Sequence, residues 1–437
     1  MTETKEKEHW VIFAFWAYSH FKPTVELALK LIQEKHVQIT FVIERHPKIN
    51  KIIDSKLHQD LNFFELPKSW EIEPDHDLFL QNLVKVIPSV LETINNKLKI
   101  DYAVFEMYTC VAYEAILPYK IPFYSFFTVN GFAVSYMLAT TLHKDLLTSV
   151  TLPVKVERED AIQSTVDLPL IYGLNSQFRG PEPTPGVNDV YFYFQEECRY
   201  MSKFVNAVPK VILNSFPEFE PKPFDCIDKL AQKFIHVGPL GLSDPPELKN
   251  DETLEWLDSK PNQSVLYIAF GTEFKIKDEE IKNICEALIE TNQYCIWAIR
   301  EPQDTFVTEQ VKRSERIRIV GWAPQVHILN HPSTGAFLSH CGWNSCVETL
   351  SAGKPVICWP IFAEQYLNAL VIVEKGLGKL ISGTGMRHSS IISTFTIVDT
   401  LKDFFDNIEG HQKVSKIVQG QLQEFVAGQA VENIRLL

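Results

Sequence analysis

Apolar runs of strand length alternate with longer amphipathic stretches along the first half of the chain. The runs are rich in β-branched and aromatic residues, which is typical of strands buried on both faces. They are HWVIFAFW, VQITFVIE, LNFFELP, DYAVFEM and PFYSFFT. Amphipathic helices are predicted from about Pro23 to Glu34 and from about Asp75 to Lys99. This order of elements predicts a parallel sheet covered by helices.

The same alternation returns in the second half. Its predicted strands are SVLYIAFGT, YCIWAIR, RIRIVGW, TGAFLSHC and PVICWP. Helices are predicted over DEEIKNICEALIE, after RIRIVGW, from Asn344 and from about Phe362. Between the halves, GPLGLSDPPELKNDE combines prolines, glycines and charges and is the predicted linker. We therefore expect two α/β domains, residues 1–240 and 241–437, that share a cleft.

Residues 131–190 interrupt the alternation, because their periodicity is weak and they contain the turn-rich run RGPEPTPG. Long irregular segments in compact domains often carry function. Two interpretations stay open for this region, a lid over a pocket and a surface excursion.

Composition and charge narrow the class of protein. With 437 residues the chain exceeds the roughly 250 to 300 that one hydrophobic core supports. The net charge of −13 argues against a nucleic-acid partner, because such proteins carry basic patches. The charged start MTETKEKEHW is unlike a signal peptide, and no run approaches the roughly 18 to 20 apolar residues that cross a bilayer. We expect a cytoplasmic protein without a membrane span.

The segment from Trp322 to Gln365 has the local pattern of a nucleotide-binding site. A predicted strand, TGAFLSH, is followed by the tight turn HCGW and by a helix that starts with NSCVETL. The free N–H groups at a helix N-terminus favour an anion such as a diphosphate. Gly342 lets the backbone approach it, and His340 and Ser345 can add side-chain donors. Taken alone, the same strand, turn and helix also fit ordinary packing.

Residues around this turn favour the binding interpretation. Trp322 follows a predicted strand, where a partly exposed indole can offer a flat face to a base. Glu348 lies one turn past Asn344, where a carboxylate can accept from both hydroxyls of a ribose. Glu364 and Gln365 supply a carboxylate and an amide, which suit a polyhydroxylated sugar.

Residues 322–365 read WAPQVHILNHPSTGAFLSHCGWNSCVETLSAGKPVICWPIFAEQ. Nearly letter for letter, they resemble the 44-residue signature of plant-type family 1 UDP-dependent glycosyltransferases. The resemblance extends to WLDSKPNQSVLYIAFGT and, more loosely, to the whole chain. It implies a glycosyltransferase B fold, in which two Rossmann-like domains face a cleft and the second holds most of the donor. In relatives a final helix packs back on the N-terminal domain.

The same resemblance implies the reaction and its substrates. The donor would be a UDP-sugar, and Gln365 favours UDP-glucose because a histidine at this point goes with galactose in the family. The acceptor would be a small, largely apolar molecule with a hydroxyl group, such as a phenolic. The resemblance implies inversion at the sugar and no metal or other cofactor. The sequence does not encode the oligomeric state in a readable pattern, and we expect a monomer.

Individual donor contacts also follow from the resemblance. Trp322 would stack on uracil. Gln325 and Glu348 are assigned to the ribose, and Thr272, His340, Asn344 and Ser345 to the diphosphate. Thr128, Trp343, Glu364 and Gln365 are assigned to the sugar. Ala323 and Gly342 are assigned to the donor site as a whole.

Inverting transfer needs a base beside the acceptor hydroxyl and a group that orients this base. His20 lies at the end of the first predicted strand, where α/β folds open their clefts, and it matches the family's catalytic histidine. Glu106 stands where the family has the partner aspartate, and its extra methylene requires roughly an ångström of accommodation. Ser19 replaces the glycine that usually precedes the histidine. A reduced rate or a shifted acceptor can follow from these changes.

Aromatic residues near these positions are candidates for an acceptor pocket. Period-two alternation would place Tyr108 on the same face as Glu106, pointing into the pocket. Trp16 and Phe127, with Phe126, fit either the pocket or the core.

Other features have a structural interpretation beside a chemical one. Asp75, His76 and Asp77 form a DxD pattern, which binds a metal in another glycosyltransferase class but also suits helix capping. His327 and His331 have zinc-like spacing without an evident third ligand. The eight cysteines are scattered without a CxxC and fit buried thiols.

Two alternative functions remain open on sequence alone. The first is a nucleotide-sugar-binding protein that lost turnover through the changes at Ser19 and Glu106. Glu106→Asp should then raise the turnover of a weakened enzyme and leave a binding protein unchanged. The second is a metal-dependent transferase that uses the DxD pattern and that a chelator would abolish.

Overall fold

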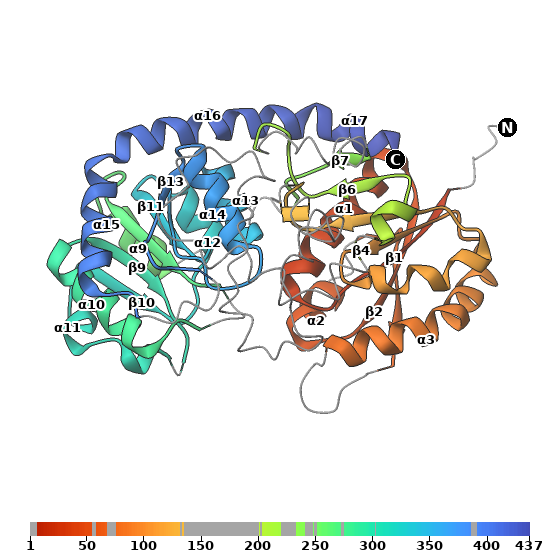
Figure 1. The fold of residues 1–437 in the computed structure, drawn as a ribbon, viewed down its shortest axis with the longest axis horizontal. Helices are drawn as coiled ribbons and strands as arrows, with labels where there is room; N and C mark the ends of the chain where they lie inside the picture. Colours follow the sequence, from red (N-terminus) through yellow and green to blue (C-terminus); the bar gives the residue numbers. More distant parts are fainter. Residues whose placement is uncertain are drawn as a thin grey trace, which may run out of the picture. The chain divides into compact units, whose positions relative to one another are not determined.

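The described residues form two compact units (Figure 1). The first contains those from Lys7 to Leu240 and the segment Phe425–Leu437, and the second contains those from Leu248 to Glu424. The computed structural model describes residues 7–54, 58–67, 76–131, 133–134, 201, 203–219, 233–240, 248, 251–271, 275–301, 303–385 and 391–437. Thr272, Asp75 and most of the predicted linker and of residues 131–190 lie outside these ranges.

A parallel sheet forms the centre of the first unit, with its described strands in the order β3-β2-β1-β4-β5-β6-β7. The strands are β1 (His9–Phe13), β2 (Gln38–Glu44), β3 (Leu61–Leu66), β4 (Tyr102–Glu106), β5 (Phe123–Phe127), β6 (Val211–Leu213) and β7 (Phe234–His236). β1 pairs with β2 and β4, so that Val11 lies opposite Thr40 on one side and Ala103 on the other. All of β1 is buried, which explains its nearly continuous apolar sequence.

Helix α1 (Tyr18–Lys35) begins before the predicted start at Pro23, and this places His20 in its first turn. Ala17 is extended, and its carbonyl accepts from the N–H groups of His20 and Phe21 at 3.0 and 2.8 Å. Pro23 lies close enough to the N-terminus for the helix to tolerate its missing N–H. The other helical elements with described bounds in this unit are α2 (Pro47–Asp54), α3 (His76–Asn95), the 3₁₀ turns η1 (Thr109–Ala115) and η2 (Leu117–Tyr119), and α17 (Gln429–Leu436).

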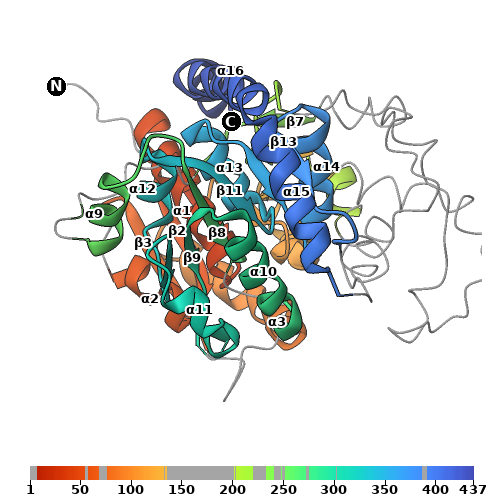
Figure 2. The same cartoon turned by 90° about the vertical axis from the view of Figure 1, so that its left-hand side faces the viewer.

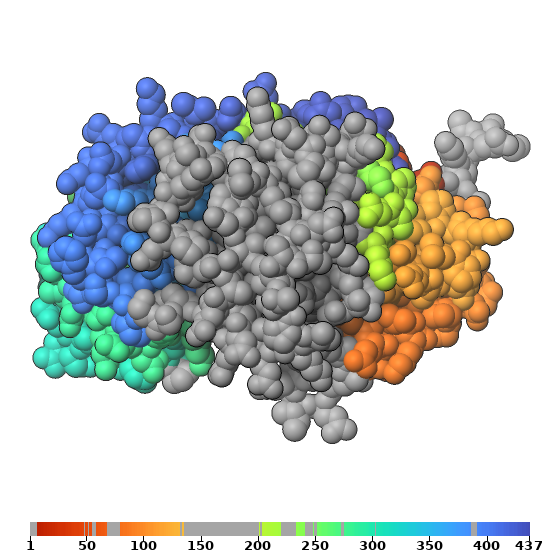
Figure 3. All heavy atoms as spheres, viewed as in Figure 1, coloured from red at the N-terminus to blue at the C-terminus, as the bar shows by residue number. Residues whose placement is uncertain are grey.

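The last helix completes the core of the first unit. Ile434 of α17 and Leu437 pack in the apolar cluster formed by α1, α2 and one face of the sheet. The hydroxyl of Tyr124 donates to the Leu437 carbonyl at 3.0 Å. Arg435 forms a 2.9 Å ion pair with Glu34 of α1. Elsewhere in this unit α3 lies at the surface, where its side chains appear in orange (Figure 3).

A second parallel sheet forms the centre of the second unit, with described strands in the order β10-β9-β8-β11-β12-β13. They are β8 (Val265–Ala269), β9 (Tyr294–Ala298), β10 (Ile317–Val320), β11 (Thr334–Ser339), β12 (Val356–Cys358) and β13 (Gly378–Leu380). The helical elements are α9 (Glu252–Asp258), α10 (Asp278–Thr291), η6 (Gln303–Phe306), α11 (Glu309–Lys312), α12 (Gln325–Asn330), α13 (Trp343–Ala352), α14 (Gln365–Glu374) and α15 (Thr394–Asp406). The boundary between the units falls within α16 (Ile408–Ala427).

Alternate residues of the second sheet pack on opposite layers of helices. Leu266 and Ile268 belong to the cluster that includes α10 and α15, whereas Val265 and Tyr267 pack with α9 and α12. Figure 2 shows α10 and α15 on one side of β8 and β9 and α9 and α12 on the other. A sheet covered on both faces explains why its strands are apolar throughout.

The two sheets reverse their strand order at equivalent points, between β1 and β4 in the first and between β8 and β11 in the second. Parallel α/β sheets bind ligands beyond the carboxyl ends of the strands at such a switch point. The residues that follow β1, β4, β8 and β11 are therefore the first place to look for function.

Among the helices of the described ranges, none combines the length and the apolar character needed to cross a membrane.

Candidate active site

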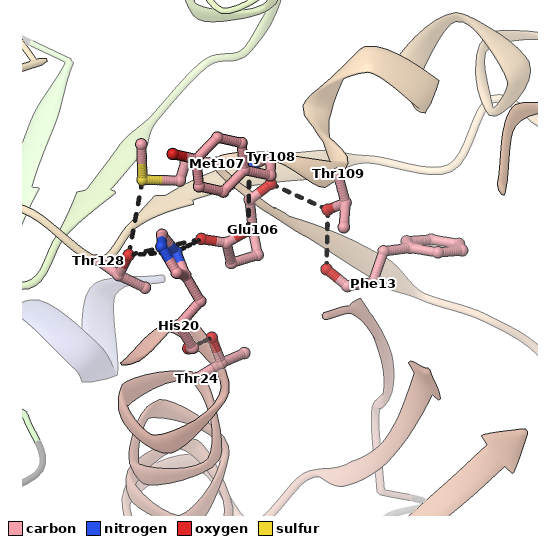
Figure 4. Close-up of polar contacts among 8 residues, drawn as sticks. All are labelled: Phe13, His20, Thr24, Glu106, Met107, Tyr108, Thr109 and Thr128. Carbon is pink, nitrogen blue, oxygen red and sulfur yellow. Dashed lines mark hydrogen bonds and ion pairs between the residues drawn. The ribbon is translucent and has the colours of Figure 1, made fainter. Parts of the chain in front are cut away.

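His20 and Glu106 lie together at the switch point of the first sheet (Figure 4). Glu106 is the last residue of β4, and His20 reaches it from the first turn of α1. The Nδ1 atom of His20 is 2.7 Å from Oε1 of Glu106. The carboxylate is fully buried, whereas the imidazole keeps 17 % of its surface exposed. Part of the ring surface is thus accessible.

Both oxygens of the Glu106 carboxylate have a donor. Oε2 accepts the backbone N–H of Tyr108 at 2.9 Å, while Oε1 faces His20 Nδ1. Because an ionised carboxylate only accepts hydrogen bonds, Nδ1 must carry the proton of a neutral imidazole. The Nε2 atom then holds the lone pair, and it can take a proton from a hydroxyl group.

Two threonines support this pair, and only one was a predicted site residue. The Oγ1 atom of Thr109 is 2.9 Å from the carbonyl oxygens of both Phe13 and Glu106, so it ties the end of β1 to the end of β4. Thr128, which was predicted at the sugar, follows β5 with 3 % of its surface exposed. Its Oγ1 atom lies 3.0 Å from His20 Nδ1.

Aromatic rings enclose the imidazole. Phe15 and Tyr108 contact it edge-on, with ring centroids 5.6 and 4.8 Å from that of His20. Tyr108 lies outside the alternation of the strand, because β4 ends at Glu106 and Tyr108 precedes the turn η1. Trp16 is half-buried and packs on Phe15 with centroids 5.0 Å apart. Phe126 and Phe127 are fully buried within β5 and belong to the core.

His340 occupies the switch point of the second sheet, between two glycines. It directly follows β11, while Gly271 closely follows the neighbouring β8. A Cβ atom added to Gly271 would lie 2.7 Å from His340 Nε2, and one added to Gly342 would lie 2.6 Å from it. Gly271 also has φ +76°, a conformation that strains other residues. We predicted that Gly342 allows an anion to approach the backbone. In the structure, the missing side chain of Gly342 also leaves space for the His340 imidazole.

Burial decides the charge of His340. It lowers the pKa of this imidazole to about 4, so the ring is neutral near pH 7. Within the described ranges Nδ1 is buried and has no hydrogen-bond partner. A neutral ring in this position can donate one N–H to an anion without adding a positive charge.

The turn after His340 presents a helix N-terminus. Gly342 is the N-cap of α13, and no side chain caps this end within the described residues. The preceding Cys341 has φ 64°, and its carbonyl accepts from the buried amide of Asn368 at 2.8 Å, which holds the turn. Trp343, predicted to face the sugar, is buried with only 3 % exposed. Asn344 is half-buried beside it. Backbone N–H groups are therefore the main polar groups that this turn offers to an anion.

Trp322 and a hydrogen-bonded glutamate lie on neighbouring elements. The indole follows β10 with 69 % of its surface exposed, and Ala323 beside it is half-buried. Gln325 opens α12 and donates to Glu348 Oε2 at 2.8 Å and to Ser345 Oγ at 3.2 Å. Its own carbonyl oxygen accepts from the hydroxyl of Tyr267 at 3.2 Å. The Gln325 side chain thus orients Glu348.

The amide oxygen of the Gln365 side chain is hydrogen-bonded to the backbone of the protein. Its Oε1 atom accepts the backbone N–H groups of Ile361 and Phe362, each at 2.9 Å. This contact sets the amide orientation and leaves Nε2 as the donor group of a residue that is 6 % exposed. Glu364, half-buried, precedes it as the N-cap of α14.

The zinc-like spacing of His327 and His331 has no support within the described ranges, and the DxD pattern includes Asp75, which lies outside them. No group of three His, Cys, Asp or Glu side chains in them is placed to hold an ion. His331 uses both ring nitrogens in the fold, since Nδ1 accepts from Ser333 N at 3.1 Å and Nε2 faces Asp258 at 3.1 Å. The described cysteines are buried free thiols, without a disulfide among them.

Sequence reasoning missed three residues that hold these sites: Thr109, Tyr267 and Asn368. Each is a hydrogen-bonding side chain in an otherwise apolar environment, in or beside a buried strand or on a buried helix. Such positions need a partner in the fold. The pattern of the chain contains this signal, but it does not show which partner each residue finds.

Comparison with known proteins agrees with this geometry. A family model of UDP-glucoronosyl and UDP-glucosyl transferases matches residues 222–416. UDP-glycosyltransferase 71A15 of Malus domestica is 28 % identical, with 85 % of this chain and 86 % of the relative aligned. The hydroquinone glucosyltransferase of Rauvolfia serpentina is 26 % identical over 90 % of this chain and 88 % of its own.

Solved structures are similar over the whole chain. A UDP-glucose: anthocyanidin 3-O-glucosyltransferase in complex with UDP has a TM-score of 0.80 and 24 % identity, covering 99 % of this chain and 98 % of that one. The Medicago truncatula UGT71G1, complexed with UDP-glucose, has a TM-score of 0.79 and 24 % identity, with the same coverage. These similarities and the two Rossmann-like sheets confirm the predicted glycosyltransferase B fold class.

Proposed function

Because the chain resembles UDP-glucosyl transferases in its family match and in its relatives, we propose that it belongs to the plant-type family of UDP-dependent glycosyltransferases and is an inverting glucosyltransferase. It transfers glucose from UDP-glucose to a hydroxyl group of a small, largely apolar acceptor such as a phenolic. One observation carries the catalytic part of this proposal, the 2.7 Å contact between His20 Nδ1 and Glu106 Oε1. It orients an imidazole whose Nε2 atom is a base.

The reaction is a single displacement. His20 Nε2 takes the proton of the acceptor hydroxyl while its oxygen attacks the anomeric carbon of glucose. The bond from that carbon to the diphosphate breaks, both electrons leave with UDP, and the configuration inverts because attack and departure occur on opposite faces. Glu106 stabilises the imidazolium that forms, because its buried carboxylate stays beside Nδ1.

Residues of the second unit hold the donor. Trp322 stacks on uracil, and its large exposed face supports this role. Glu348, oriented by Gln325, accepts from the ribose hydroxyls. His340 and the N-terminus of α13 with Asn344 donate to the diphosphate and stabilise it as a leaving group.

The sugar contacts follow the chemistry of the remaining polar groups. The Nε2 donor of Gln365 and the carboxylate of Glu364 contact hydroxyl groups of the sugar. Thr272 and Ser345 complete the phosphate contacts and Ala323 lines the base site, as the family resemblance implies. Trp343 supports the sugar site through its buried side chain rather than by direct contact.

A phenolic acceptor suits the surroundings of His20. Phe15, Trp16 and Tyr108 bring aromatic rings around the imidazole, and aromatic rings pack well on one another. Hydroquinone and anthocyanidin, the acceptors named for the relatives, are of this class. We further propose that the enzyme is a cytoplasmic monomer. It needs no metal, because its own side chains move the proton and bind the diphosphate.

The test measures UDP release from UDP-glucose with hydroquinone and a small panel of other phenolics. Wild type should release UDP only when acceptor is present, and EDTA should not change the rate. His20→Ala should lose at least about 100-fold in kcat, because it removes the general base. His58→Ala, which changes a histidine with an exposed side chain elsewhere in the same unit, is the matched control.

Two outcomes would overturn the proposal. Retention of the wild-type rate by His20→Ala would show that His20 is not the base. Tight UDP binding without release on any acceptor would favour the nucleotide-sugar-binding protein.

A further inference from the structure

Thr128 is a third member of the His20 and Glu106 pair. It directly follows β5, the strand next to β4, and so lies on the same sheet edge as Glu106. Its Oγ1 atom is 3.0 Å from His20 Nδ1 and 3.5 Å from Glu106 Oε1 (Figure 4). Thr128 keeps only 3 % of its surface exposed. Its hydroxyl also contacts Met107 Sδ at 3.5 Å.

Counting protons assigns the direction of these contacts. Nδ1 carries a single proton, and the contact of 2.7 Å makes Glu106 its main acceptor. At 3.0 Å the Thr128 oxygen is a second acceptor for the same N–H. The threonine cannot be the donor to Nδ1, because the lone pair of Nδ1 would then face the carboxylate at 2.7 Å. The Thr128 proton is directed to Glu106 or Met107 instead.

Two acceptors constrain the imidazole more than one. With only Glu106, the ring can pivot about its N–H bond and carry Nε2 away from a fixed direction. A second acceptor on a different strand restricts this rotation and favours the tautomer with the proton on Nδ1. Thr24 Oγ1, donating to the His20 carbonyl at 2.7 Å, holds the backbone below.

We infer that Thr128 is a positioning residue, whose hydroxyl sets the tautomer and the direction of the His20 base. The inference rests on the proposed function, since it concerns how that base is held. It replaces the expected contact between Thr128 and the donor sugar. The hydroxyl is directed toward the histidine and the carboxylate, and its burial leaves little surface for a ligand.

The test compares Thr128→Val with Thr128→Ser. Valine keeps the shape and removes the oxygen, while serine keeps the oxygen. We expect Thr128→Val to lose about fivefold to tenfold in kcat, the effect of one modest hydrogen bond. Its KM for UDP-glucose should stay within about twofold of wild type, and Thr128→Ser should keep most of the kcat.

A second readout does not need turnover. In ¹⁵N spectra of histidine-labelled protein, the His20 signals are identified by their loss in His20→Ala. Wild type should show a protonated Nδ1 and an unprotonated Nε2. In Thr128→Val the two shifts should move toward each other, because the tautomers mix. This readout decides the inference even when none of the chosen acceptors is a substrate.

Three results would overturn the inference. A raised KM for UDP-glucose with unchanged kcat would place the hydroxyl on the donor. Equal losses in the serine and valine variants would assign the effect to packing of the methyl group. Unchanged ¹⁵N shifts in Thr128→Val would show that the tautomer does not depend on Thr128.

Discussion

His20 and His340 lie at equivalent points of the two sheets, beyond the strands where the strand order reverses. His20 lies beyond the end of β1 and faces the Glu106 carboxylate at the end of β4. His340 follows β11 and faces Gly271, which lies beyond the end of β8. Equivalent topology thus places one histidine beside a carboxylate and the other, among the described residues, beside two glycines.

The partners decide the chemistry of each ring. The carboxylate of Glu106 holds Nδ1 of His20, which suits this ring to the role of base in the proposed reaction. Burial without a carboxylate lowers the pKa of His340 to about 4 and keeps it a neutral donor. In the proposed function, the position in the fold brings each histidine to its substrate, and the neighbours of the ring suit it to act as a base or as a donor.

The largest effect should come from removing the charge of Glu106. In Glu106→Gln the Oε1 atom can accept from Tyr108 N–H, which turns the amide N–H group toward His20 Nδ1. Nδ1 must then accept, and the proton moves to Nε2, where the base is needed. We expect kcat to fall between about 100-fold and 10,000-fold in the UDP-release assay. UDP affinity should not change.

The control is Glu65→Gln, which removes an exposed carboxylate paired with Arg45. Glu106→Asp is a milder change that keeps the charge. A shorter side chain cannot keep both the His20 Nδ1 and the Tyr108 N–H contacts without backbone movement. It should therefore lower kcat, by about tenfold, rather than raise it as the sequence alone suggested. A gain in turnover would show that Glu106 is the weaker partner.

The next effect concerns stability at low pH. The folded pKa of His340 is about 4, below the ordinary 6.5. As pH falls, the unfolded chain binds a proton here before the folded chain does, so the free energy of unfolding decreases through this window. Between about pH 7.5 and pH 5, wild type should lose about 2 kcal/mol more than His340→Gln, measured by urea unfolding.

His236 remains in both proteins, so its own lowered pKa of about 4 cancels in this difference. Parallel stability curves for wild type and His340→Gln would show that His340 is charged or solvated in the folded chain. The contrast between the two histidines would then be lost.

The smallest effect should come from the glycines around His340. In Gly342→Ala the added Cβ meets His340 Nε2 at 2.6 Å and displaces the ring. We expect the Kd for UDP, measured by calorimetry, to rise about fivefold to tenfold. Gly321→Ala is the matched control, since nothing lies within 4 Å of its Cβ, and it should bind UDP normally. Equal affinities for the two variants would remove His340 from the diphosphate site.

Sequence patterns predicted most of the fold and the strand ends beside which the candidate site residues lie. Strands such as β1 are continuous apolar runs, and turns such as the one before α13 have a specific local sequence, so both can be read without knowledge of contacts. The start of α1 could not, because Pro23 is a common start signal and the extended Ala17 before the helix has no distinctive sequence.

Side-chain partners were less predictable, because they depend on elements far apart in the chain. The sequence suggested that Glu106 orients His20, and the structure brings the two into contact at a normal distance despite the longer side chain. It gave no sign that Gln365 would use its carbonyl on Ile361 and Phe362. It likewise gave no sign that the Thr128 hydroxyl would contact His20 Nδ1.

The segment Phe425–Leu437 belongs to the first unit, although the second unit precedes it in the chain. During synthesis, the first unit therefore emerges from the ribosome long before Ile434 and Leu437 can fill its core. Until then the apolar surface that α17 covers on α1 is open to chaperones and to other nascent chains. The two units are separate bodies, but the first cannot finish folding before the second has been translated.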